Sequence, residues 1–128
     1  MQVAETYGII VKVETEYVAV QSKPNESEYF FAYRIQITNN SNYTVKLLSR
    51  KWHIADSTYD IREVEGEGVV GVQPVIEQGD SYTYVSGCQL QSGIGEMWGH
   101  YTLERPVLDD TIEVEIPKFN MIVPWLKN

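Results

Sequence analysis

Apolar side chains recur at every second residue along most of this sequence, and that period limits the possible folds more than any other feature. In the stretch IIVKVETEYVAV, the apolar Ile9, Val11 and Val13 alternate with Lys12 and Glu14. Because successive side chains of a β-strand point to opposite faces, the alternation predicts a strand with one buried face. No convincing stripe of apolar residues at helical spacing occurs elsewhere. The sequence therefore predicts an all-β protein.

Further strands are expected where the same alternation returns. Leu48 interrupts it, which predicts a bulge or bend at that point. The tail after Pro117, residues 118–128, is expected to contain a last edge strand bracketed by Pro117 and Pro124. The expected segments are 9–20, 29–39, 43–57, 58–66, 81–87, 95–104, 111–117 and 118–128.

Seven to eight short strands separated by turn residues predict an antiparallel β-sandwich in a single domain over residues 1–128. Cys88 is the only cysteine, so the disulfide of an antibody-type domain is ruled out. A sandwich of the fibronectin-III type, within the immunoglobulin-like class, fits better.

Charge narrows the possible partners. The chain has 10 Lys and Arg against 18 Asp and Glu, a net charge of −8, and no dense basic segment. Such a surface repels phosphate backbones, so no nucleic-acid partner is expected. The beginning of the sequence lacks the pattern of a signal peptide, and the longest nearly apolar run, GVVGVQPVI, is too short for membrane insertion. A cytoplasmic location is the expectation.

The segment EVEGEGVVGVQP contains Gly66, Gly68 and Gly71 in the G-x-G-x-x-G spacing of dinucleotide-binding folds. That motif works between a strand and a helix, and Pro74 and the nearby valines predict that no helix begins here. The glycines are expected to provide positive φ angles or close backbone approach. The alternative is that backbone amides of this loop, with Gln73, hold a pyrophosphate or nucleotide phosphate.

Metal binding and catalysis have weaker support in the sequence. Glu63 and Glu65 share one strand face and are candidate ligands for a divalent cation such as Mg²⁺ or Co²⁺, but no spacing typical of a dedicated metal site accompanies them. No nucleophile with a base partner is recognisable. The sequence thus predicts a protein that is not an enzyme, has no catalytic residues and needs no cofactor.

Several blocks together resemble one known family. VETEYVAVQS, YFFAYRIQITN, VKLLSRKWHI, EVEGEGVVGVQPVI, YVSGCQL and MWGHYTL occur in the order and spacing of the bacterial ApaG proteins, also named CorD. The match runs from about Val11 to Val123, and the departures, in STYDI and ERPVLDDTIE, look like loop changes.

The resemblance implies a fibronectin-III-like sandwich and a connection with cobalt resistance and with magnesium efflux and homeostasis. It implies no catalytic residue. The function expected is therefore a binding or adaptor module that acts through contacts with an as yet unidentified protein partner. The alternatives are a homodimer formed through an edge strand, a binder of phosphorylated small molecules such as diadenosine polyphosphates, and a direct binder of divalent cations.

Overall fold

The protein is described by a computed structural model that covers residues 1–57 and 61–127. Within these residues there is no α-helix, only four single turns of 3-10 helix, and so no helix with the length and apolar character of a membrane span. The strands are β1 (Gln2–Thr6), β2 (Ile9–Tyr17), β3 (Tyr29–Asn39), β4 (Val45–Asp56), β5 (Ile61–Glu67), β6 (Val75–Ile76), β7 (Ser81–Leu90), β8 (Ile94–Arg105) and β9 (Asp110–Ile122).

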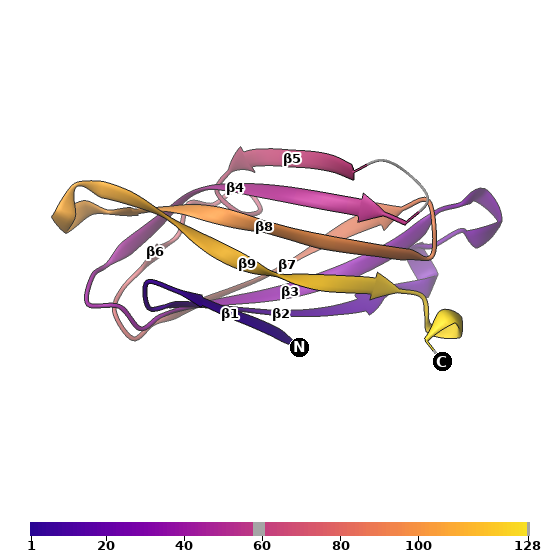
Figure 1. Ribbon diagram of the computed structural model, residues 1–128, viewed down its shortest axis with the longest axis horizontal. Coiled ribbons are helices and arrows are strands. Elements are labelled where there is room, and N and C mark those ends of the chain that lie inside the picture. The colour runs from indigo at the N-terminus through magenta and orange to yellow at the C-terminus, as the bar shows by residue number, and fades with distance from the viewer. Residues whose placement is uncertain (58–60, 128) are drawn as a thin grey trace.

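The strands form two antiparallel sheets that pack face to face (Figure 1). The four-stranded sheet has the order β1-β2-β3-β7, and the five-stranded sheet has the order β5-β4-β8-β9. The short β6 pairs with β4 on the same side as β5. The expected antiparallel sandwich is therefore confirmed. β5 and β7 are border strands of their respective sheets.

The core is built from the positions that the alternation assigns to the inner faces. Val11 and Ile35 are fully buried, as are Leu47 and Val114 on the opposite sheet. Burying a side chain of this size stabilises the fold by about 1.5–3 kcal/mol. Aromatic rings join the two sheets: Trp52 lies 5.5 Å from Tyr33 and 6.0 Å from Phe119 between ring centroids.

The structure has more strands than the seven to eight expected, because neither β1 nor the short β6 was foreseen. Most of the side chains of β1 are exposed, so it lacks the buried face that produces alternation. It is joined to β2 by Tyr7 and Gly8, with φ angles of 53° and 80°. Two central residues with positive φ are typical of the tight type I′ turn of a hairpin.

The expectation of a separate last strand after Pro117 is wrong. β9 runs without a break from Asp110 to Ile122, through Pro117. The register of β9 on β8 shifts between the pairs formed by Met97 and by Gly99, which places Pro117 where the ladder is already interrupted. A missing N–H is tolerated there, and β9 is also a border strand. The bulge predicted at Leu48 is confirmed by the register shift between Leu47 and Ser49.

Two buried polar side chains hold loops in place. The Asn39 side-chain amide donates to the carbonyls of Tyr43 and Ile76, at 2.7 and 2.9 Å. The Asp56 carboxylate accepts the backbone N–H groups of Gln91, at 2.5 Å, and Ser92, at 3.0 Å. These bonds compensate for the loss of hydration on burial.

Candidate functional site

The glycine-rich segment leaves the end of β5 and returns to the sheet at β6. Gly68 and Gly71 have φ angles of 59° and 78°, and Val70 between them also has a positive φ, of 47°. The backbone N–H of Gly68 donates to the carbonyl of Leu48 at 2.8 Å. Val69 and Val72 exchange backbone hydrogen bonds of 2.7 and 3.0 Å, which closes the loop on itself. The predicted positive φ angles are confirmed at Gly68 and Gly71, and no helix follows them.

Gly66 has a different task, which is to make room for an arginine. A Cβ atom at this position would lie 2.7 Å from Nη1 of Arg50. That same nitrogen donates to the carbonyls of Glu67 and Gly68, at 3.0 and 2.8 Å. The loop is thus anchored to β4 by a guanidinium group that lies against Gly66.

The four residues proposed for phosphate binding do gather in one place. Gly66, Gly68 and Gly71 lie in or beside the loop, and the side-chain amide of Gln73 reaches back to the carbonyl of Leu48 at 3.0 Å. The N–H groups of Gly68, Val69 and Val72 and the amide of Gln73 all donate within the protein. Phosphate binding by this loop therefore stays a prediction, while the loop's internal hydrogen bonds already explain its sequence.

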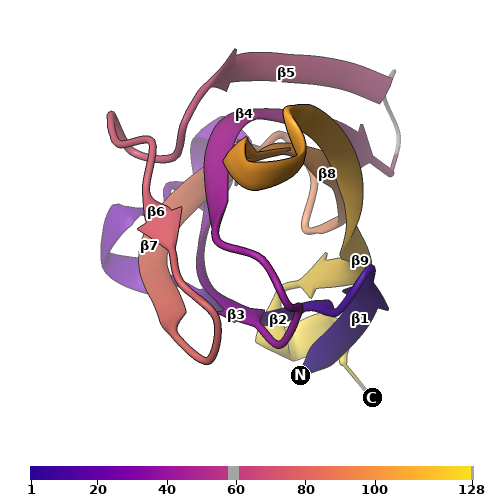
Figure 2. The same cartoon turned by 90° about the vertical axis from the view of Figure 1, so that its left-hand side faces the viewer.

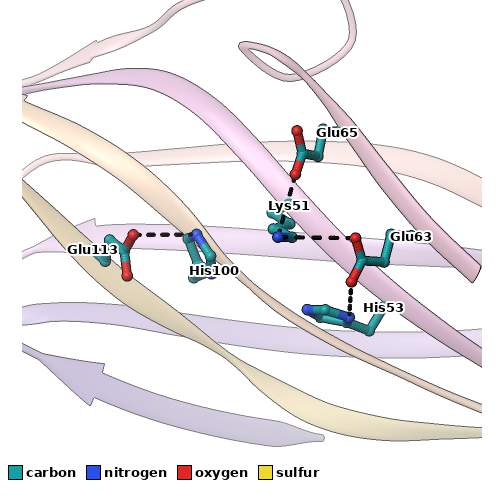
Figure 3. A network of polar contacts seen from close by, with 6 residues as sticks. All are labelled: Lys51, His53, Glu63, Glu65, His100 and Glu113. Carbon is teal, nitrogen blue, oxygen red and sulfur yellow. Dashed lines mark ion pairs between the residues drawn. The ribbon is translucent and has the colours of Figure 1, made fainter.

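Glu63 and Glu65 lie together on the outer face of β5, as predicted. Figure 3 shows Lys51 of β4 between them, with its Nζ 3.9 Å from Glu63 and 3.3 Å from Glu65. Nδ1 of His53 lies 3.5 Å from the Glu63 carboxylate, and its ring stacks on Trp98 at 5.4 Å between centroids. The two candidate metal ligands therefore face a lysine ammonium group.

A second histidine lies on the same outer face. Nε2 of His100 is 3.6 Å from Glu113, and this pair is separate from the one that His53 makes with Glu63 (Figure 3). Within residues 1–57 and 61–127, no three His, Cys, Asp or Glu side chains come close enough together to hold a metal ion. Metal binding by Glu63 and Glu65 also stays a prediction.

The inner faces of β5 and β4 enclose a feature that the sequence did not reveal, a cleft between the borders of the two sheets. It has a volume of about 300 Å³ and opens between β5 and β7. The cleft is lined by Tyr33, Arg50, Trp52, Ile54, Arg62, Val64, Ser86, Gly87, Cys88, Gln89 and Met97. We call this feature the inter-sheet cleft.

Arg62 crosses the inter-sheet cleft from β5 to β7. Its Nη2 donates to the carbonyl of Gln89 at 2.8 Å and lies 3.6 Å from Sγ of Cys88. Burial raises the pKa of the Cys88 thiol, an effect that the Arg62 charge partly opposes. Cys88 is therefore a neutral wall of the cleft at physiological pH, not an activated nucleophile.

Arg50 and Arg62 were missed as site residues, although the sequence held a signal for one of them. Arg50 has the same parity along β4 as the apolar Trp52 and Ile54, which are buried on the inner face. A charged residue at an inward position needs a polar partner or an open border, and here it has both.

The inter-sheet cleft lies within a larger surface formed by β5, residues 68–74, β6 and β7, which we call the open side. Figure 2 shows the loop, β6 and β7 following one another along one flank of the sandwich, with β5 above them. Large apolar side chains are exposed along the β5, loop and β6 part of this surface; they are Ile61, Val64, Val70, Val72 and Val75.

Comparison with known proteins agrees with the sequence motifs. The family model described as the ApaG domain matches residues 19–105. Protein ApaG of Methylorubrum extorquens (strain PA1) is 46% identical over 127 residues, which is 99% of this chain and 97% of that protein. Protein ApaG of Brucella canis is 48% identical over 126 residues, covering 97% and 95% of the two chains.

A solved structure shows the same fold. The crystal structure of the putative ApaA protein from Bordetella pertussis superposes with a TM-score of 0.87 at 38% identity, over 92% of this chain and 95% of that one. With a matching family model and relatives aligned over nearly their full length, the chain belongs to the ApaG family.

Proposed function

We propose that this ApaG-family chain is a non-enzymatic binding module that docks a partner protein on its open side. The observation that carries the proposal is the coincidence of exposed apolar side chains with two strand borders. Val70, Val72 and Val75 are exposed on the loop and β6, between β5 above and β7 below. A concentration of exposed apolar side chains of this kind marks interaction surfaces.

The strand borders add the means of binding. In the described chain β5 pairs only with β4, and β7 only with β3, so each has one border without a strand partner. Such a border offers a row of backbone donors and acceptors to an incoming segment. The glycine-rich loop then shapes the rim of the surface, in keeping with the hydrogen bonds that fix it.

The cellular setting of the proposal comes from family resemblance. ApaG proteins are associated with cobalt resistance and magnesium efflux, so we place the partner among the proteins of divalent-cation homeostasis in the cytoplasm. The single, buried Cys88 suits a reducing compartment. In this role the chain would change cation handling through its partner without itself binding the cation.

A photocrosslinking experiment in cells tests the proposal. A benzophenone amino acid is placed at Val70, which is 63% exposed on the open side, and in a matched variant at Val107, which is 78% exposed in the turn between β8 and β9. We expect one protein to be crosslinked strongly from Val70 and weakly from Val107. Equal crosslinking from both positions, or none from Val70, would refute the open side as a docking surface. Crosslinking only to a second copy of this chain would replace the adaptor by a homodimer.

A further inference from the structure

β5 extends its sheet beyond the opposite sheet. The five-stranded sheet places β5 at the border next to β4, and the four-stranded sheet ends at β7. Arg62 bridges from β5 to Gln89 of β7, but the residues of β5 stay exposed or half-buried, and the inter-sheet cleft of about 300 Å³ lies between β5 and β7. The cleft is the place where a fifth strand of the smaller sheet would lie.

The middle of the inter-sheet cleft is apolar. Trp52 is paired with Val64 across β4 and β5, and both line the cleft together with Tyr33 and Ile54. Val64 is 38% exposed because nothing in the described chain covers it. An apolar side chain from a ligand would gain contact here and remove this surface from water.

Both ends of the cleft are cationic. Arg50 lies at one end, beneath Gly66, and Arg62 at the other, beside Cys88 and Gln89. Arg50 uses only Nη1 for its hydrogen bonds to the loop, and Arg62 uses only Nη2 for its contacts with β7. In the described part of the chain the other nitrogens of both groups make no hydrogen bond. Each guanidinium thus has donors left for an anion.

Among the carboxylates of residues 1–57 and 61–127, none forms an ion pair with Arg50 or Arg62. No acidic residue lines the inter-sheet cleft, although the chain as a whole carries a net charge of −8. Glu63 and Glu65 point to the outer face instead, where Lys51 pairs with them. Two arginines that have no carboxylate partner in the described part of an acidic protein favour an anionic ligand at this site.

The spacing of the two arginines matches an extended chain. Arg62 is opposite Ile54, and Gly66 is opposite Arg50, so the backbone positions of the two arginines are four residues apart along the strands. At roughly 3.3 Å per residue this is about 13 Å. Side chains at positions i, i+2 and i+4 of a strand point to the same side and span the same length.

We propose that the inter-sheet cleft receives an extended segment of the partner protein with the pattern acidic–x–apolar–x–acidic. The segment adds to the border of β7 as a fifth strand, places its two carboxylates on Arg50 and Arg62, and covers Val64, which lies beside the buried Trp52, with the apolar side chain between the two carboxylates. This inference rests on the proposed function and specifies the chemistry of the partner. Backbone pairing supplies affinity and the three inward side chains supply specificity.

A synthetic peptide tests the pattern directly. The probe is acetyl-Thr-Glu-Thr-Val-Thr-Glu-Thr-amide, titrated into the full-length protein and followed by amide NMR. We expect saturable shifts at Val64, Gly66 and Cys88, and slowed hydrogen exchange along β7. The matched peptides are one with both glutamates replaced by glutamine, and one in which the second glutamate moves by one residue to the opposite face. Each is expected to bind about tenfold more weakly or worse, because at least one charge-assisted pair is lost.

Protein variants locate the binding. Arg62→Gln is expected to weaken the probe about tenfold. Arg34 is an exposed arginine of β3, on the outer face of the four-stranded sheet. Arg34→Gln should therefore leave binding unchanged. Arg50→Gln should also weaken binding, but Arg50 anchors the loop, so its melting temperature is measured alongside. If that variant unfolds, Arg62→Gln and the matched peptides still decide the matter.

Several results would overturn the inference. If the shifted or neutral peptide binds as tightly as the probe, the cleft does not distinguish the acidic–x–apolar–x–acidic pattern. If the probe shows no saturable binding at millimolar concentration, the inference is rejected. Equally tight binding of sebacate, a short dicarboxylate, would indicate a small-anion site without strand addition. If Val70 still crosslinks to one partner and Arg62→Gln leaves that crosslink unchanged, the docking proposal stands and the acidic-strand inference fails. If the benzophenone at Val70 crosslinks no protein when the rest of the chain is unchanged, the docking proposal itself is refuted, regardless of whether the peptide binds.

Discussion

Gly68 is the residue in the loop at which the backbone leaves no space for a side chain. It combines a φ of 59° with a Cβ position only 2.1 Å from the carbonyl oxygen of Val72. Gly71 has a similar φ, of 78°, but nothing within 4 Å of its Cβ position. The two glycines thus separate the effect of backbone strain from that of steric conflict.

We therefore expect Gly68→Val to lower the free energy of unfolding by roughly 2–4 kcal/mol, since strain and collision add. Gly71→Ala should cost only about 1–2 kcal/mol, the strain of the left-handed region alone. Urea unfolding followed by tryptophan fluorescence measures both. Equal losses would mean that the contact with Val72 relaxes freely, and an unchanged stability in Gly68→Val would contradict the positive-φ explanation.

Two buried tyrosines make stability sensitive to alkaline pH. Burial raises the pKa of the Tyr84 and Tyr101 hydroxyls, which are hydrogen-bonded to each other between the sheets. The unfolded chain ionises its tyrosines near pH 10, while the folded chain holds these two neutral. Stability from this source is present below pH 10 and is lost as the pH rises above it.

At pH 11 each of the two tyrosines should therefore reduce the free energy of unfolding by about 1.4 kcal/mol relative to pH 9. Urea unfolding at the two pH values measures the difference. The control is the Tyr84→Phe, Tyr101→Phe double variant, in which the free energy of unfolding should fall less between pH 9 and pH 11. Because both hydroxyls are removed together, neither is left without its hydrogen-bond partner. The same decrease in wild type and control would assign the alkaline effect to other groups.

At the scale of the elements, the turn between β7 and β8 depends on a side chain from β4. Asp56 is 4% exposed and accepts the N–H groups of Gln91 and Ser92. Asp56→Ala should cost about 1–3 kcal/mol, because it leaves these donors without their acceptor. Hydrogen exchange should accelerate at Gln91 and Ser92 before the rest of β8. A turn that keeps its protection in the variant would show that the hairpin does not need Asp56.

The outer faces of β4 and β5 determine whether the acidic pair binds metal. Lys51 competes with any cation at Glu63 and Glu65, with which it makes contacts of 3.9 and 3.3 Å. Lys51→Gln should change stability by less than about 1 kcal/mol, as is usual for exposed ion pairs. It should strengthen any Co²⁺ binding at these residues by about fivefold, by removing a nearby positive charge.

Paramagnetic broadening of amide signals during Co²⁺ titration checks this expectation. Lys23→Gln is the control, since it removes a lysine paired with Glu26 in the segment between β2 and β3, outside the contacts of Glu63 and Glu65. No saturable broadening near Glu63 and Glu65 in any of the three proteins at millimolar Co²⁺ would eliminate these residues as a metal site.

The alternation of apolar and polar residues predicted the strands well where a strand has one buried and one exposed face. β2 buries Ile9, Val11 and Val13 as expected, and β3 lies in the expected segment 29–39 with every second residue from Phe31 to Ile37 buried. The alternation did not predict β1, whose side chains are mostly exposed. It also predicted two strands, separated at Pro117, where the structure has the single strand β9. In both cases the decisive contact is with another strand, which a local pattern does not contain. The part of the expected strand at residues 58–60 lies outside the described residues.

At the scale of the whole molecule, the two sheets share one core, to which both contribute fully buried residues such as Ile35 and Val114. We expect a single cooperative unfolding transition in urea, with coincident curves from fluorescence and far-UV circular dichroism. The slope m should be about 1–3 kcal/mol/M, the range for a small domain. Separated transitions would show that the sheets, or the open side, unfold independently and would contradict a single domain.

The sequence by itself determined that the protein is an antiparallel β-sandwich of the ApaG family, because alternation and family motifs are properties of neighbouring residues. It also predicted that the glycines of the loop provide positive φ or close backbone approach, and the structure assigned positive φ to Gly68 and Gly71. Only the tertiary structure decided that Lys51 faces the two glutamates and that Arg50 and Arg62 lie at opposite ends of one cleft. Those relations depend on strand register and on how far one sheet extends past the other. Register and sheet offset are set by packing between segments distant in the chain, so no local pattern could reveal them.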